Sequence, residues 1–287
     1  MTLQPPTGAS PHWRFTDPAT GDGLTLVPER GGLVTGWRCG GREILYFDAE
    51  RFADPARSVR GGIPVLFPIC GNLPGDVLEL PQGQFPLSQH GFARDLPWSI
   101  APLAEAAGVR LRLEDGPLSR PHFPFSFALE LDLRLEPAAL AITARISNRG
   151  AGGSPPLPFS LGLHPYIAVA DPARARIEGL PDACFNHLTM APAVTAELLQ
   201  RLGDGVDVLC HGQGPVRLVD PVGAVAVTLH TTAPMDLVVV WSEPPRPMVC
   251  LEPWTGPRGA LRSGERRLDV EPGEQLELFC CYTVERL

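Results

Sequence analysis

The sequence has 287 residues, 44% of them apolar, which supplies enough hydrophobic surface for a sizeable core and argues against a disordered chain. Its net charge of −8 argues against a nucleic-acid-binding protein, since a duplex binder needs a basic face. All 24 basic residues are arginine, so Schiff-base chemistry, a lysine general base and a Walker-type phosphate lysine are excluded.

Targeting and redox signals are sparse along the chain. No apolar run approaches the roughly 18 to 20 residues that a bilayer span requires. The N-terminal segment lacks the charged region followed by an apolar region that is typical of a signal peptide. The seven cysteines form no C-x-x-C pair, which disfavours a disulfide framework and a cysteine zinc site. We therefore expect a cytoplasmic protein that does not act on a membrane.

Strand patterns dominate the chain from end to end. The clearest is FALELDLRLE at residues 127–136, where apolar residues occupy every second position and predict one buried and one solvated side. The 30 glycines and 33 prolines are expected in turns and at sheet edges, and residues 193–202 alone predict a short helix. The other predicted strands, in chain order, lie at residues 24–28, 43–48, 109–115, 139–147, 216–220, 225–230, 236–241 and 276–284.

Regular strands without helical periods between them favour an antiparallel sandwich over a βαβ fold. The Gly/Pro-rich residues 148–158 are a candidate domain boundary, but strands of the same pattern continue on both sides. The expected architecture is all-β, a large antiparallel β-sandwich with few short helices, formed by a single domain over residues 1–287.

Three segments break the strand pattern and carry side chains suited to chemistry. Residues 60–98 contain RGGIPVLFPICGNLPGD and QHGFARDLPW, with Arg60, His90 and Arg94 on a long Gly/Pro loop. FSLGLHPYIAVAD places His164 before a proline, and VCLEPWTGPRGAL places Glu252 after an apolar run. These segments are the candidate functional regions.

Glu252 and His164 suit acid–base chemistry. A carboxylate flanked by apolar residues is partly desolvated, which raises its pKa toward neutrality, and a histidine titrates near neutral pH without adjustment. The remaining histidines and Glu243, in a proline-rich turn, are expected to be structural or solvated. Candidates for an apolar wall under a sugar ring are Phe67, Phe92, Trp98, Tyr166 and Trp254, and the histidines set aside are His12, His122, His187, His211 and His230.

The motifs GGIPVLFPICGN, QHGFARDLPW, GLHPY and CLEPWTGPRGAL, in this order, resemble the galactose mutarotase-like superfamily. They are most similar to its branch of aldose 1-epimerase-like and hexose-6-phosphate epimerase-like proteins, and the likeness runs from about Gly31 to the C-terminus. The resemblance implies a super-sandwich fold and an enzyme, a mutarotase, that interconverts the α and β anomers of a sugar without cofactor or metal.

The resemblance also implies roles for single residues. His164 corresponds to the general acid and Glu252 to the general base, while His90 holds sugar oxygens and Arg60 contacts the substrate. Asp207 is the best match for an aspartate that binds hydroxyls. Arg94 either lines the site or pairs with Asp95.

The expected substrate is a small-molecule sugar, and the expected assembly is a monomer or weak homodimer. The paired Asn-Arg signature of typical galactose mutarotases is not evident here, which places galactose in doubt. The branch that acts on phosphorylated sugars binds phosphate through arginines near the first two motifs, where Arg60 and Arg94 lie. A free aldose is the first expectation and a hexose 6-phosphate the second. A non-catalytic carbohydrate-binding sandwich, which would not need His164 and Glu252, is the rival class.

Overall fold

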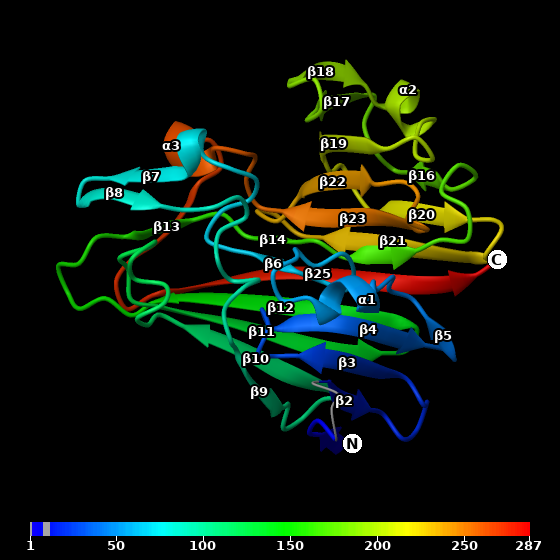
Figure 1. Cartoon of the computed structure of the whole chain (residues 1–287), viewed down its shortest axis with the longest axis horizontal. Helices are drawn as coiled ribbons and strands as arrows, with labels where there is room; N and C mark the ends of the chain where they lie inside the picture. The colour runs from blue at the N-terminus through cyan, green and yellow to red at the C-terminus, as the bar shows by residue number, and fades with distance from the viewer. Residues whose placement is uncertain (1, 8–11) are drawn as a thin grey trace.

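The computed structural model describes residues 2–7 and 12–287, and β-strands dominate it (Figure 1). A five-stranded sheet near the N-terminus has the order β1-β2-β3-β4-β5. Its strands are β1 (Thr2–Gln4), β2 (Trp13–Thr16), β3 (Gly23–Val27), β4 (Leu33–Cys39) and β5 (Arg42–Glu43).

Two eight-stranded sheets make up most of the rest. The first has the order β16-β20-β21-β25-β12-β11-β10-β9. Its strands are β9 (Ser99–Pro102), β10 (Gly108–Glu114), β11 (Phe127–Glu136), β12 (Ala139–Asn148), β16 (Arg176–Glu178), β20 (Val216–Asp220), β21 (Val225–Thr231) and β25 (Gln275–Arg286).

The second eight-stranded sheet has the order β18-β17-β19-β22-β23-β14-β6, with β15 also paired to β23. Its strands are β6 (Val65–Leu66), β14 (Gly162–Leu163), β15 (Tyr166–Ala168), β17 (Ala183–Asn186), β18 (Ala191–Val194), β19 (Val206–His211), β22 (Leu237–Ser242) and β23 (Met248–Trp254). The small pairs β7 (Val77–Leu80) with β8 (Gly83–Pro86) and β13 (Leu157–Phe159) with β24 (Leu268–Val270) complete the strands.

Helices are few and short in the described residues. They are α1 (Ala49–Ala53), α2 (Thr195–Leu199), α3 (Ala260–Ser263) and a 3-10 turn at Pro74–Asp76. The long strand ladders are antiparallel. The prediction of an all-β antiparallel sandwich with few helices is confirmed. Across residues 2–7 and 12–287, no helix combines the length and apolarity needed to cross a membrane.

The largest cluster of buried apolar side chains connects the three large sheets. Leu26 of β3, Leu131 of β11 and Leu251 of β23 all belong to it and are at most 2% exposed. Burial on this scale supplies the main driving force for bringing sheets together. The second eight-stranded sheet is thereby packed against the rest of the molecule, which fixes the position of the strands that carry the candidate site.

Strand β11 forms at the predicted residues, but both of its faces are covered. The alternate residues Phe127 to Leu133 are buried as expected, and Asp132 on the opposite face is also only 4% exposed. Its carboxylate receives hydrogen bonds from Arg110, at 2.6 and 2.8 Å, and from Arg145, at 2.7 Å. Long arginine side chains from the neighbouring strands therefore cover the face that was predicted to be solvated.

Two local predictions are wrong. The helix expected over residues 193–202 is restricted to α2, because residues 193–194 belong to β18 and pair with β17. The strand expected over residues 43–48 is reduced to isolated bridges from Leu45 to Ile167 and from Phe47 to Gly61. In both places tertiary pairing overrides the local preference of the sequence.

Candidate active site

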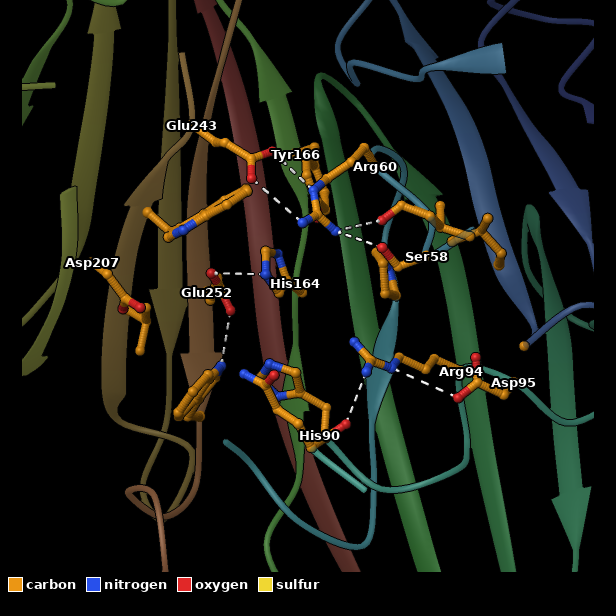
Figure 2. A pocket seen from close by; sticks show the side chains of 18 of the residues that line it. Ser58, Arg60, His90, Arg94, Asp95, His164, Tyr166, Asp207, Glu243 and Glu252 are labelled. Atoms are coloured by element: carbon orange, nitrogen blue, oxygen red, sulfur yellow. Dashed lines mark hydrogen bonds and ion pairs between the residues drawn. The ribbon is translucent and has the colours of Figure 1, made fainter. Parts of the chain in front are cut away.

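A cavity of about 410 Å³ opens beside the second eight-stranded sheet, within the size range of small-ligand pockets. Residues from the loops after α1 and β8 and from strands β19, β22 and β23 line it, so segments far apart in the sequence meet there (Figure 2). All six residues predicted for the site lie in its wall: Arg60, His90, Arg94, His164, Asp207 and Glu252.

The strand register explains why the side chains converge. Val239 on β22 is paired with Glu252 on β23, and Trp241 is paired with Asp207 on one side and Cys250 on the other. Side chains two residues apart point to the same face of a sheet. Glu252 and Trp254 therefore project together from β23, on the same face as Asp207 from β19, with β22 between the two strands.

His164 and Glu252 meet inside the cavity. The imidazole Nε2 lies 3.4 Å from Oε1 of the carboxyl group, and the two side chains are 13% and 1% exposed. His164 stacks on Tyr166 with ring centroids 4.8 Å apart, and its backbone N–H donates to the carbonyl of Pro64. Trp254 Nε1 donates a 3.1 Å hydrogen bond to the other carboxyl oxygen, Oε2. Both side chains are thus held in place by their neighbours.

Burial sets the charge state of this pair. It raises the pKa of the Glu252 carboxyl well above its ordinary value, and the negative charge of Asp207 adds to the effect. Burial, followed by the charge of Arg94, lowers the pKa of His164 to about 3. Both shifts favour a protonated carboxyl group facing a neutral imidazole over the ion pair. The pair carries one proton that can move between its members.

His90 is a neutral hydrogen-bond donor in the cavity wall. Its Nδ1 accepts from the backbone N–H of Gly71 at 3.1 Å, and the backbone N–H of His90 donates to the Gly71 carbonyl at 2.6 Å. With Nδ1 accepting, the proton of the neutral ring lies on Nε2. Burial, aided by Arg94, lowers the pKa of His90 well below its usual value. The ring is therefore suited to donating to an oxygen atom of a ligand.

The prediction that Glu243 is structural or solvated in its proline-rich turn is wrong. Glu243 lines the cavity instead of standing in solvent, and its side chain is 33% exposed. Arg60 reaches its two carboxylate oxygens at 2.9 and 3.4 Å, while Arg246 contacts Oε2 at 2.5 Å. The sequence could not show that Glu243 would meet Arg60, which is 183 residues away along the chain.

Arg94 is partnered more weakly than Arg60. Its Nη2 donates to the carbonyl of Gln89 at 2.8 Å, and its Nε lies 3.8 Å from the carboxylate of Asp95, which is 71% exposed. Burial lowers the pKa of this guanidinium. Figure 2 shows Arg94 and Arg60 on the same side of the His164 and Glu252 pair. Of the two, Arg94 has more donor capacity left for a ligand.

Asp207 lies on the other side of the acid–base pair (Figure 2). Its Oδ1 is 2.7 Å from Nδ1 of His187, and its Oδ2 accepts from Arg258 at 3.1 Å. Arg258 also reaches Asn72 at 3.3 Å. The aspartate is therefore fixed in orientation, and each of its oxygens retains a lone pair that could accept from a hydroxyl group of a ligand.

Two of the five aromatic residues predicted for the cavity wall line the cavity, and three lie in the core. Tyr166 and Trp254 line the cavity, whereas Phe67, Phe92 and Trp98 are at most 7% exposed and belong to the main core. Continuing the alternation of β22 (Leu237–Ser242) one residue past its end would have placed Glu243 on the same side as Trp241. The lining residues not predicted for the site include Ser58, Gln89, Trp241, Glu243 and Arg258.

One cluster in the described residues has the composition of a cation site. His164, Cys250 and Glu252 each present a ligand atom, and these atoms lie within 4.8 Å of one another. Cys250 is fully buried among Tyr166 and Met248, and burial raises the pKa of its thiol well above the usual value. A thiol that stays protonated is a poor metal ligand. We interpret Cys250 as packing under the acid–base pair.

Comparisons with known proteins show the family and the fold of the chain. The model of the aldose 1-epimerase family matches residues 20–282. The crystal structure of the Slr1438 protein of Synechocystis sp. PCC 6803 is 35% identical with a TM-score of 0.90, covering 100% of this chain and 99% of that one. A galactose mutarotase related enzyme of Lactobacillus acidophilus has the same fold, with a TM-score of 0.76 at 17% identity over 96% of this chain and 97% of that one.

Curated relatives match over a shorter length. Proteins named "Putative glucose-6-phosphate 1-epimerase" are 34% identical over 160 residues in Cenchrus ciliaris and 29% identical over 183 residues in Escherichia coli K12. These matches cover 52% and 62% of this chain and 45% and 56% of the relatives, so the chain spans about half the length of the curated relatives it matches. With the family model covering most of the chain, the protein belongs to the aldose 1-epimerase family.

Proposed function

We propose that this protein is a 1-epimerase that interconverts sugar anomers by acid–base catalysis, with a hexose 6-phosphate as its preferred substrate. The observation that carries the reaction type is the 3.4 Å contact between His164 Nε2 and Glu252 Oε1 in the cavity wall. Anomerisation needs one group to take the proton of the anomeric hydroxyl and another to protonate the ring oxygen. These two oxygens are bonded to the same carbon, so their catalysts must be close neighbours.

The shared proton of the pair accounts for both directions of the reaction. When it moves from the Glu252 carboxyl to the imidazole, Glu252 becomes the base and His164 the acid. Glu252 then removes the proton from the anomeric hydroxyl while His164 protonates the ring oxygen, and the C1–O5 bond breaks to give the aldehyde. Rotation about C1–C2 and reversal of the two transfers close the ring on the other face. Each proton transfer contributes about 10²–10⁴-fold.

The two ends of the cavity suit the two ends of a hexose 6-phosphate. In a pyranose, the 2- and 3-hydroxyls lie on one side of the anomeric carbon, and C6 branches next to the ring oxygen on the other. Asp207 flanks the acid–base pair on one side, and Arg60 and Arg94 lie on the other (Figure 2). Arginine recognises phosphate with paired N–H donors, and Arg94 has few protein partners.

A free aldose is the second candidate, and Glu243 is the observation that favours it. This carboxylate already accepts two hydrogen bonds from Arg60. Of the two arginines, Arg94 therefore has more N–H donors left for a phosphate group. A dianionic phosphate near Glu243 would also be repelled. A free aldose is therefore tested alongside the phosphorylated sugar.

Anomer exchange by saturation-transfer NMR distinguishes these substrates. Glucose 6-phosphate and glucose are compared at equal concentration, with the spontaneous rate subtracted. We expect faster exchange of the phosphorylated sugar. Faster exchange of glucose would assign the free aldose, and exchange of neither across a panel of aldoses and their 6-phosphates would contradict the epimerase proposal.

A further inference from the structure

His187 contacts two residues of the cavity wall without lining the cavity itself. It follows β17 directly, and its side chain is only 2% exposed. Its ring stacks on Trp254, with centroids 6.1 Å apart and an interplanar angle of 26°. Its Nδ1 lies 2.7 Å from Asp207. A histidine that touches both of these residues from behind is placed to control their geometry.

The first contact orients Asp207. Hydrogen bonding to a carboxylate requires the imidazole proton on Nδ1, so this contact also fixes the tautomer. The backbone N–H of His187 donates to the backbone carbonyl of Asp207 at 2.8 Å, which ties the two main chains together as well. With Arg258 on the other carboxylate oxygen, the Asp207 side chain is held from two directions.

The second contact reaches Glu252 through Trp254. The indole lies between His187, which stacks on it, and His90, whose ring meets it edge-on at 5.9 Å and 77°. Its Nε1 donates to Glu252 Oε2 at 3.1 Å. The tilt of the indole therefore determines where the Glu252 carboxyl is held, and His187 limits that tilt.

We propose that His187 is a positioning residue that orients Asp207 by a hydrogen bond and Glu252 through the Trp254 indole. This inference rests on the proposed epimerase function. The two contacts act on different steps: Asp207 binds a hydroxyl in the ground state, whereas Glu252 moves a proton in the transition state. Losing the hydrogen bond should raise KM, and losing the stack should lower kcat.

Two substitutions separate the contacts. His187→Asn places an amide N–H near the position of Nδ1, so it keeps the hydrogen bond and loses the stack. His187→Phe keeps an aromatic ring against Trp254 and loses the donor. We expect His187→Asn to lower kcat about tenfold with KM nearly unchanged, because small misplacements of catalytic groups are costly. We expect His187→Phe to raise KM about tenfold, because the loss of one charge-assisted hydrogen bond weakens binding by about this factor.

His230→Asn is the matched control, since His230 lies outside the cavity wall and is 3.3 Å from Thr283. Circular dichroism and thermal unfolding report the fold of each variant. The proposal would be overturned if each variant changed KM and kcat in equal proportion. It would also be overturned if neither variant changed KM or kcat.

A second readout does not depend on turnover. The indole N–H resonance of Trp254, assigned with Trp254→Phe in ¹⁵N-tryptophan-labelled protein, should shift in His187→Asn more than in His187→Phe. An unmoved resonance in His187→Asn would also refute the positioning role. If the wild-type protein exchanges no sugar, the epimerase proposal fails while this resonance still tests the contact between His187 and Trp254.

Discussion

Replacing Glu252 with glutamine should remove activity and at the same time stabilise the protein. Glu252→Gln keeps the size of the side chain and an oxygen that can accept from Trp254, but it removes the proposed proton-transfer group. The loss of the proposed general base predicts a fall in kcat of about 10²–10⁴-fold, measured by anomer exchange. The rest of the cavity wall is unchanged in the Glu252→Gln protein, so the variant should still bind the sugar.

The stability change follows from the raised pKa of Glu252. An acid whose pKa is higher in the folded state contributes its full stability below its unfolded value of 4.5 and loses it as pH rises toward the folded value. Each unit of separation corresponds to about 1.36 kcal/mol. The roughly 2.5 units between 4.5 and pH 7 therefore limit the cost to about 3 kcal/mol, which the neutral glutamine avoids.

Thermal unfolding at several pH values measures this difference. For chains of this size about 1 kcal/mol moves Tm by roughly 2–4 °C. The Glu252→Gln protein should melt above the wild type by several degrees at pH 7, and the gap should close as pH falls toward 4.5. Glu252→Asp is the control that keeps a carboxyl group. A variant that keeps wild-type turnover would refute the catalytic role, and a lower Tm at pH 7 would refute the burial argument.

Three further outcomes test the cavity. Arg94→Gln should raise KM for glucose 6-phosphate about 10-fold or more, through loss of a charge-assisted contact, and leave exchange of glucose unchanged; equal effects on both sugars would contradict a phosphate role. Glu243→Gln should release Arg60 and lower KM for the phosphorylated sugar about fivefold, and a rise would contradict this. Since burial lowers the pKa of His164 to about 3, this histidine costs stability as pH drops from 6.5 toward 3, so the stability of the wild type relative to His164→Gln should fall over this range in thermal unfolding.

The alternating strand pattern predicted most of the fold. β11 spans the predicted residues 127–136, and β12, β20, β21 and β25 form where apolar residues alternate. Period-two alternation depends only on neighbouring residues, and an alternating segment forms a strand wherever its apolar face can be buried. The pattern failed at residues 43–48, where chain partners at Gly61 and Ile167 allow only single bridges.

Sequence motifs named the candidate residues, but their meeting depended on strand register. Glu252 faces the cavity because β23 pairs with β22 with Val239 opposite it, and a shift of one residue would turn it to the other face. His187 and Glu243 carried no signal of their own in the sequence. Their partners, Asp207 and Arg60, come from other segments of the chain, and only folding brings them within contact distance.

The sequence by itself determined the class of fold, the apolar surroundings of Glu252 and the absence of lysine chemistry, because these depend on composition and on neighbours along the chain. The tertiary structure alone decided which charges pair, which aromatic rings line the cavity and which face the core. Charge pairing and burial are set by distances in space. A linear pattern fixes those distances only within a single strand or turn.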